Sequence, residues 1–371
     1  MGLGPSVSAR LPDFPWDQLT AVREQASGHP DGLVDLSVGT PVDPTPQVVQ
    51  QALRDSADAP GYPTVWGTPA LRASIIAALV RRCGSVPLTD ECVLPTIGSK
   101  ELVAALPSQL GVRAGQSVLV PEVAYPTYAV GALLAGAEPL AGDATAVAGS
   151  RDVPLVWLNS PANPTGAVLS ADRMRAVVDW AREHRAVVAS DECYFECAWD
   201  AEPVSVLDPR VNGGSLDSVL AVHSLSKRSN LAGYRAAFVA GDPRLVSELR
   251  EVRKHAGHLV PRPVQEAMRA ALDDDDHLEE QRSRYRRRRG LLREALIGAG
   301  FAIDASEGSL YLWATRGEDC RDTLGWLASL GILVAPGDFY GAAGRRHVRV
   351  ALTATDERVG SAVERLARVK S

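Results

Sequence analysis

The amino-acid sequence predicts an α/β protein built on a mostly parallel central sheet. Short apolar runs alternate along the chain with longer amphipathic stretches, as strands alternate with helices in this class. Several runs, such as LVWLN at 155–159 and AVVAS at 186–190, are almost wholly apolar, which is typical of strands covered by helices on both faces. At about 150 residues per domain, a chain of 371 residues indicates two domains.

The larger domain is expected to hold six strands, at 92–96, 117–120, 155–159, 186–190, 219–223 and 236–240. Amphipathic helices separate these strands. The helix expected at 68–82 carries apolar residues at i, i+4, i+7 and i+8 from Leu71. Thr45 is expected to cap a helix in which Pro46 occupies the first turn, and Ser170 opens another helix that reaches about residue 184.

The last third of the chain predicts a smaller α+β domain. A highly charged stretch at 272–298, with DDDD at 273–276 and RYRRRR at 284–289, is interpreted as a solvated helix that joins the two lobes. Strands are expected after it, at 301–304, 310–314, 332–334 and 348–352. We therefore expect a large domain over 40–255 and a small domain formed by 1–39 together with 256–371.

Composition and charge exclude several function classes. The formal net charge of -6 argues against general nucleic-acid binding, which needs a basic face. No apolar run reaches the ~18–20 residues that a membrane span requires, and the first ten residues lack a secretion-signal pattern. The five cysteines are interpreted as reduced thiols of a cytoplasmic protein. Cys193 and Cys197 have no second Cys/His pair at zinc-site spacing, so no metal is expected.

Polar motifs follow the predicted strands. Ligands of a parallel sheet bind beyond the carboxyl ends of its strands, so these motifs are expected to converge. They are TIGSK at 96–100, PEVAYPTY at 121–128, NSPANPTG at 159–166, SDECY at 190–194 and HSLSKRSNLAGYR at 223–235. Taken singly, each motif has an ordinary structural interpretation: the lysine of SLSK is a solvated charge, NPTG forms a turn and DE caps a helix. GSK lacks the spacing of a Walker loop. Together they bring an amine, a carboxylate, an arginine, a glycine-rich helix start and an aromatic pair to one edge. A phosphorylated, planar, electron-withdrawing cofactor requires that set.

The motifs NPTG, SDECY, SLSK and the arginine eight positions after the lysine resemble the fold-type I pyridoxal-phosphate aminotransferases of class I/II. The resemblance covers about residues 34–369. The phrases LPDFPW, HPDGLVDLSVGTPVDPTP, LPTIGSKELVA, HSLSKRSNLAGYR and VAPGDFYG are most similar to actinobacterial N-succinyldiaminopimelate aminotransferases. The resemblance implies the fold-type I architecture and pyridoxal 5′-phosphate as the cofactor.

The resemblance also implies the catalytic residues. Lys227 would form the covalent link to the cofactor aldehyde and then act as general base and acid. Asp191 would face the pyridine nitrogen and keep it protonated. Tyr194 and Asn163 would hydrogen-bond the phenolic oxygen.

The phosphate would lie at the helix start 98–100, where Gly98, Ser99 and Lys100 present free N–H groups. Arg235 and Ser226 would bind it with their side chains, with Ser224 as a further candidate. Tyr125 would stack on the cofactor ring. Tyr62 matches a tyrosine that reaches the phosphate from the neighbouring subunit, which implies a homodimer with shared active sites.

For the substrate, Arg349 matches the family's carboxylate-binding arginine, and Gly39 would approach the same carboxylate through its backbone. Asn163 would also contact the substrate. The narrower resemblance implies a long polyanionic substrate, whose far carboxylates need further cations. Arg228 and the segment 253–258 are the candidates for that contact.

The implied reaction is transamination between glutamate, which becomes 2-oxoglutarate, and a succinylated keto acid in the diaminopimelate route to lysine. The same motifs are compatible with an aminotransferase for another amino acid, such as aspartate or an aromatic one, and with a pyridoxal-phosphate-dependent C–S lyase. A non-enzymatic sensor in a transcription regulator would need an attached DNA-binding region, for which the short N-terminal segment is expected to leave no room.

Overall fold

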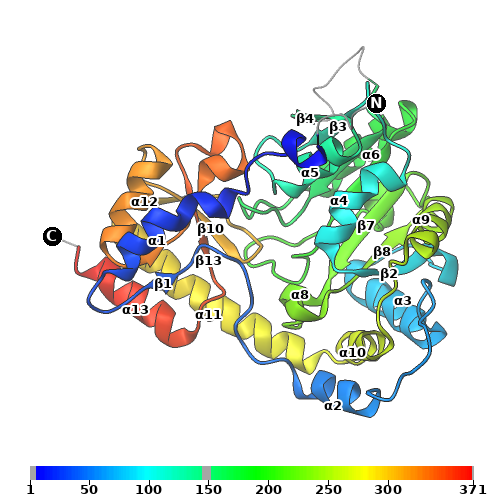
Figure 1. The fold of residues 1–371 in the computed structure, drawn as a ribbon, viewed down its shortest axis with the longest axis horizontal. Coiled ribbons are helices and arrows are strands. Elements are labelled where there is room, and N and C mark those ends of the chain that lie inside the picture. The colour runs from blue at the N-terminus through cyan, green and yellow to red at the C-terminus, as the bar shows by residue number, and fades with distance from the viewer. Residues whose placement is uncertain (1–5, 144–151, 370–371) are drawn as a thin grey trace.

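A seven-stranded sheet forms the centre of the larger part of the molecule (Figure 1). The computed structural model describes residues 6–143 and 152–369. The strand order is β2-β8-β7-β6-β5-β3-β4, and all neighbours are parallel except that β8 runs antiparallel to both β2 and β7. The strands are β2 (Val93–Ile97), β3 (Ser117–Val120), β4 (Glu138–Ala141), β5 (Leu155–Asn159), β6 (Val187–Asp191), β7 (Val219–Ser224) and β8 (Ala236–Gly241).

Helices lie on both sides of this sheet and bury its apolar strands. They are α2 (Gln47–Asp55), α3 (Pro69–Cys83), α4 (Ser99–Gln109), α5 (Thr127–Leu134), α6 (Ala171–Glu183), α7 (Pro209–Asn212), α8 (Leu225–Arg228), α9 (Pro243–Ala256) and α10 (Arg262–Asp273). Every residue of β5, β7 and β8 is buried, as expected for strands covered on two faces. The predicted α/β class with a mostly parallel sheet is therefore confirmed.

A four-stranded antiparallel sheet, in the order β12-β13-β10-β9, forms the smaller unit together with a parallel pair, β1 and β11. Its strands are β1 (Val34–Asp35), β9 (Ala302–Asp304), β10 (Tyr311–Thr315), β11 (Ile332–Leu333), β12 (Ala335–Pro336) and β13 (Val348–Ala351). Its helices are α1 (Thr20–Ser27), α12 (Cys320–Ser329) and α13 (Asp356–Ala367). N-terminal and C-terminal segments thus pack together here, as the blue and red ribbons of Figure 1 show. The boundaries expected for the two domains remain a prediction.

The predicted helix at 272–298 is two helices in the structure. Helix α10 ends at Asp273 and packs against α2 and α3, and α11 (Asp276–Gly298) then runs across to the smaller unit (Figure 1). The interpretation of this stretch as simply solvated is wrong for one face of α11. Tyr285, Arg288 and Leu292 are buried there, because this face packs against the rest of the protein.

One predicted helix cap is also wrong. Helix α2 begins at Gln47 with Pro46 in the capping position, and no side chain caps it. Thr45 instead offers its carbonyl oxygen to Nε2 of Gln50, at 2.8 Å. By contrast, the Oγ of Ser170 accepts a hydrogen bond from the backbone N–H of Arg173 and caps α6 as predicted.

All five cysteines are buried free thiols, as expected for a reduced protein. No helix in the described ranges is long and apolar enough to cross a bilayer.

Candidate active site

A cavity of about 760 Å³ opens beyond the carboxyl ends of β5, β6 and β7. Its walls come from both units and from the N-terminal segment. The residues that line it are Phe14, Trp16, Arg23, Val38, Gly39, Thr40, Ser99, Lys100, Val103, Tyr125, Tyr128, Asn163, Asp191, Cys193, Tyr194, Ser224, Ser226, Lys227, Ala232, Gly233, Arg235, Tyr311 and Arg349. Nearly all of the residues predicted for the site are therefore brought together.

Lys227 lies on the short helix α8, directly after β7. The Oγ of Ser224 caps this helix by accepting a hydrogen bond from the backbone N–H of Ser226, at 3.2 Å. The Lys227 amine donates a hydrogen bond to the carbonyl oxygen of Gly39, which lies in the segment that follows β1 of the smaller unit. Burial lowers the pKa of Lys227, and the nearby Arg349 guanidinium lowers it further. A lowered pKa increases the fraction of neutral amine, which is the nucleophilic form, relative to a free lysine.

Asp191 ends β6 and is buried at the floor of the cavity. Its Oδ2 accepts a hydrogen bond of 2.7 Å from the Tyr128 hydroxyl, and its Oδ1 accepts one of 3.1 Å from the backbone N–H of Cys193. Burial raises the pKa of Asp191, and these hydrogen bonds oppose the rise because they stabilise the ionised form. Sequence reasoning missed Tyr128, although the repeated tyrosine in YPTY was a usable signal.

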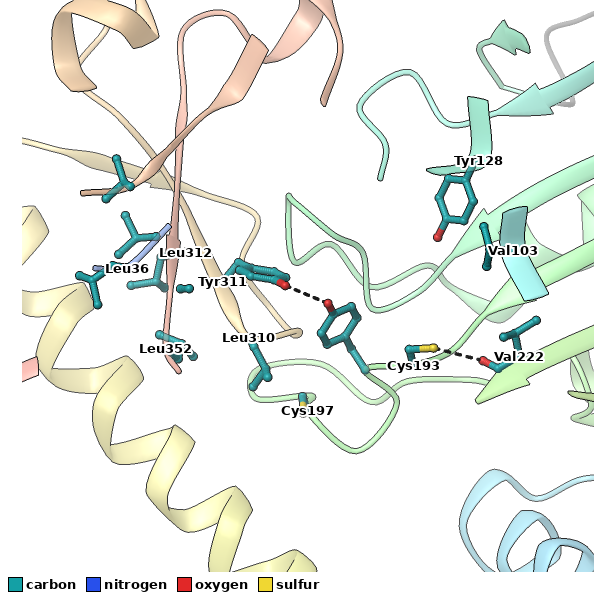
Figure 2. Packing of buried hydrophobic residues seen from close by; sticks show 14 of the residues in the cluster. Leu36, Val103, Tyr128, Cys193, Cys197, Val222, Leu310, Tyr311, Leu312 and Leu352 are labelled. Carbon is teal, nitrogen blue, oxygen red and sulfur yellow. Dashed lines mark hydrogen bonds between the residues drawn. The ribbon is translucent and has the colours of Figure 1, made fainter. Parts of the chain in front are cut away.

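Tyr194 meets a tyrosine of the smaller unit. Its hydroxyl lies 2.9 Å from the hydroxyl of Tyr311. Figure 2 labels Tyr311 and marks the hydrogen bond at its hydroxyl with a dashed line. Tyr311 belongs to β10, and the same ring leaves no room for a side chain at residue 39, because a Cβ on Gly39 would lie 2.7 Å from the Tyr311 Cζ. Tyr311 was also missed, since no local motif distinguishes it from the other apolar residues of its strand.

An anion cradle forms where α4 begins. Gly98 has a φ of +76°, and a Cβ there would lie 2.6 Å from the Arg235 Cζ, so glycine lets the guanidinium reach the helix start. Ser99, Ser224 and Ser226 line the same cavity. Backbone N–H groups, hydroxyls and a guanidinium here suit a phosphate group.

Arg349 of β13 is buried on the side of the cavity opposite the seven-stranded sheet that carries Asp191. Its Nη1 donates to Oδ1 of Asn163 at 2.8 Å, and its Nη2 donates to the carbonyl oxygen of Ser37 at 2.6 Å. Its Nε has no hydrogen-bond partner among the described residues. The guanidinium also lies 3.9 Å from the centre of the Tyr311 ring. A carboxylate entering the cavity would find this fixed cation.

Comparison with known proteins identifies the family. A model of the aminotransferase class I and II family matches residues 31–366. The chain belongs to the class I and II aminotransferases. A protein of Mycobacterium tuberculosis named "Probable aminotransferase" is 59% identical over 369 residues, which cover 99% of this chain and 88% of that protein. The 4-dedimethylamino-4-oxo-anhydrotetracycline transaminase OxyQ of Streptomyces rimosus is 57% identical over 356 residues, 96% of this chain and 99% of OxyQ. The solved N-succinyldiaminopimelate aminotransferase of Mycobacterium tuberculosis superposes with a TM-score of 0.87 at 26% identity, covering 99% of this chain and all of that one.

Aminotransferases of this family use pyridoxal phosphate, and the residues of this cavity fit it. The glycine at residue 98 leaves the anion cradle open to Arg235, Asp191 presents a buried carboxylate, and Lys227 presents a buried amine. In pyridoxal phosphate, the cradle suits the phosphate, the carboxylate suits the ring nitrogen and the amine suits the aldehyde.

Arg228 does not take part in this cavity, so the prediction that it binds substrate is wrong. Its side chain is 5% exposed, and its Nη1 donates to Oε1 of Glu196 at 2.8 Å. The segment 253–258 also lies elsewhere. Arg253 is buried against Glu101 at 2.6 Å, and Lys254 pairs with Glu251 on the surface of α9.

Tyr62 lies outside the cavity of its own chain. Its side chain is 98% exposed beside a second hollow of about 1120 Å³, which is lined by α2, α10 and the segment 58–69. Its predicted contact with a neighbouring subunit's phosphate remains a prediction.

Proposed function

We propose that this aminotransferase transfers an amino group between N-succinyl-LL-2,6-diaminopimelate and 2-oxoglutarate, in the cytoplasm, as part of lysine synthesis. One observation carries the proposal: a single cavity joins the Lys227 amine, the Asp191 carboxylate and the Arg349 guanidinium in a strongly cationic lining. The structural similarity to the N-succinyldiaminopimelate aminotransferase of Mycobacterium tuberculosis supports the choice of substrate. Five buried free thiols support a reducing compartment.

In this proposal each residue has a defined task. The bound cofactor supplies an aldehyde and an electron-withdrawing ring. Lys227 would hold the cofactor through its amine and would move a proton at the substrate Cα. Asp191 would present a negative charge to the ring nitrogen, and the hydrogen bond from Tyr128 stabilises that charge. Tyr194 and Asn163 would hydrogen-bond the phenolic oxygen.

The remaining residues bind and orient. Arg235, Ser224, Ser226 and the backbone of 98–100 would hold the phosphate, and Tyr125 would pack on the ring. Arg349 receives the substrate α-carboxylate, because its Nε is free and its other nitrogens are fixed by Asn163 and a backbone carbonyl. Gly39 gives the carboxylate room. We also propose a homodimer, in which Tyr62 of each subunit completes the partner's site; its full exposure in the single chain supports this.

A second candidate is favoured by the identity of 57% to OxyQ. The chain would then aminate a polycyclic ketone of the tetracycline type. This polycyclic acceptor would stack on the aromatic wall of Phe14 and Trp16, with ring centres 5.6 Å apart, and would not need a cationic rim.

A half-reaction panel tests the proposal. The purified enzyme in its pyridoxal form is mixed in a stopped-flow instrument with N-succinyl-LL-2,6-diaminopimelate, glutamate, aspartate or phenylalanine, and the loss of cofactor absorbance is followed. We expect the succinylated compound and glutamate to react fastest. The tetracycline-type ketone is tested separately, with glutamate as donor and chromatographic detection of the amine. A higher kcat/KM for aspartate, phenylalanine or the ketone would overturn the substrate assignment.

A further inference from the structure

The hydroxyl of Tyr194 has a partner that the proposed function does not use. The proposed function, on which this inference rests, gives Tyr194 the task of hydrogen-bonding the phenolic oxygen of the cofactor. In the structure this hydroxyl lies 2.9 Å from the hydroxyl of Tyr311, which belongs to β10 of the smaller unit. Both side chains are buried, so bulk water does not compete for the contact. A residue of the smaller unit therefore touches a residue that is expected to bind the cofactor.

The ring of Tyr311 is held on several sides. Tyr311 pairs with Ala351 across the smaller sheet, so Arg349, two residues away on β13, lies diagonally beside it on the same face. The Arg349 guanidinium lies 3.9 Å from the centre of the Tyr311 ring, which is within the range of a cation–π contact. Glycine at residue 39 leaves room for the ring, because a Cβ there would lie 2.7 Å from the Tyr311 Cζ. The Tyr194 ring meets it edge-on, with ring centres 5.6 Å apart, and these contacts together fix the position of the Tyr311 hydroxyl.

The two hydroxyls can use their protons in only one productive order. Each tyrosine hydroxyl donates one hydrogen bond, and either of the two can be the donor of this pair. If Tyr194 donates its proton to the phenolic oxygen, its contact with Tyr311 is a hydrogen bond only when Tyr311 is the donor. A hydroxyl that accepts a hydrogen bond also becomes a stronger donor, because successive bonds of a chain polarise one another.

The charges around Tyr311 favour this order. Burial raises the pKa of Tyr311, but the Arg349 guanidinium and the Lys227 amine lower it overall. Burial raises the pKa of Tyr194, and the neighbouring Tyr311 raises it further. Tyr311 thus releases its proton more readily than Tyr194 and is suited to be the donor of the pair. The titratable groups that face Tyr311 are Tyr125, Tyr194, Cys197, Lys227, Tyr340 and Arg349.

We propose that Tyr311 is a positioning residue of the cofactor site, whose hydroxyl donates to the Tyr194 oxygen and directs the Tyr194 proton to the phenolic oxygen of bound pyridoxal phosphate. The strengthened donor stabilises negative charge on that oxygen and lowers the affinity of the bound cofactor for a proton there. Because Tyr311 comes from the smaller unit, a contact between the two units contributes to this protonation state in addition to Asp191.

The absorbance of the bound cofactor tests this role without any substrate. The visible spectrum of the holoenzyme is titrated with pH for the wild type, Tyr311→Phe, Tyr194→Phe and the double variant, and the midpoints of the spectral change are compared. Both substitutions keep the ring and remove one oxygen. Tyr340→Phe is the matched control, because Tyr340 is also buried and its ring centre lies 5.0 Å from the Arg349 guanidinium. The Tyr340 hydroxyl has no hydrogen-bond partner among the described residues.

We expect Tyr311→Phe to raise the midpoint by about 0.3–1 pH unit, which is about 2- to 10-fold in proton affinity. Tyr194→Phe should raise it by about 1–2 pH units, since it removes a donor to a charged oxygen. In the Tyr194→Phe background the Tyr311 substitution should have no further effect, because Tyr311 acts through Tyr194. Tyr340→Phe should leave the midpoint unchanged. A purely structural role of Tyr311 would lower the melting temperature and leave the midpoint where it is.

The outcomes separate this inference from the proposed function. If the succinylated compound is no substrate but the midpoints shift as expected, the substrate assignment fails and the role of Tyr311 stands. If Tyr194→Phe raises the midpoint and Tyr311→Phe does not, or if Tyr311→Phe has the same effect in both backgrounds, the role of Tyr311 is overturned and Tyr194 keeps its task. If Tyr194→Phe leaves the midpoint unchanged, the task of Tyr194 and the role of Tyr311 are overturned together.

Discussion

Replacement of Tyr128 by Phe tests how the protein controls the charge of Asp191. The change removes one buried oxygen, which donates the hydrogen bond of 2.7 Å to Oδ2 of Asp191. The ring itself is expected to stay in place. It stacks on Trp157, with ring centres 4.9 Å apart, and meets Tyr125 edge-on at 5.8 Å.

The size of the effect follows from the kind of bond that is lost. A hydrogen bond to a charged group contributes about 1.5–3 kcal/mol, which is about 10- to 150-fold in an equilibrium constant. The loss falls on the ionised form of Asp191, because Tyr128 donates to it. Burial already raises the pKa of Asp191, and removal of this donor raises it further. The carboxylate is lost as pH falls through that pKa, so the acid limb of the activity profile must move to higher pH.

The assay is the single-turnover half-reaction with a fixed amino acid, measured across the pH range for wild type and Tyr128→Phe. We expect the rate at the acid end to fall by about 10- to 150-fold and the plateau at higher pH to fall less. Tyr234→Phe is the matched control, since the Tyr234 ring packs against the core outside the cavity. A profile of Tyr128→Phe that coincides with wild type in both rate and acid limb would refute the reasoning.

Four further predictions concern other residues of the structure. Lys227→Ala should lower the half-reaction rate by at least ~10²–10⁴-fold while much of the cofactor affinity remains, as measured by stopped-flow and by cofactor titration. Arg288→Ala should destabilise the protein by about 2–4 kcal/mol in urea unfolding, because it leaves the half-buried Asp43 without its cationic partner after loss of two bonds of 2.6 and 2.8 Å. The exposed control Arg287→Ala should cost about 1 kcal/mol or less. Burial raises the pKa of Asp43, but hydrogen bonds from Arg288 and Gln281 lower it overall. The ionised Asp43 therefore stabilises the folded protein above about pH 4, and this contribution is lost as pH falls through the folded-state pKa. If the unfolding free energy of Asp43→Asn had the same pH dependence as that of the wild type, this assignment would be contradicted. For the dimer, sedimentation should give the mass of two subunits. A mixed dimer of one Tyr62→Phe subunit and one Lys227→Ala subunit should contain one site with both native residues and regain part of the activity. A fully active monomer would exclude shared sites.

The strands of the sheet were predictable because of their burial. Runs such as 155–159 are apolar throughout, and the structure places β5 at the same residues. The edge strand β4 was missed, since its sequence EPLA is half exposed and shows neither alternation nor a continuous apolar run. The strands β1 and β12 were missed because each has only two residues, too few for a periodic pattern.

The site was predictable where a motif follows a strand directly. Lys227 and Asp191 stand at the ends of β7 and β6, and the parallel arrangement brings those ends together. The partners Tyr128 and Tyr311 were not predictable in this way. They lie 63 and 117 residues from the side chains they contact, and only the packing of different elements sets those contacts.

The misplaced Arg228 shows why neighbours in sequence do not share a site. Lys227 and Arg228 follow one another on α8, and successive side chains of an α-helix point about 100° apart. When Lys227 faces the cavity, Arg228 must therefore face elsewhere, and it is buried against Glu196. A buried guanidinium needs such a partner to offset its lost hydration, which leaves it little capacity for a ligand. Proximity to the catalytic lysine in sequence therefore does not identify the cations that reach a substrate, because the direction of each side chain on the helix decides which of them faces the cavity.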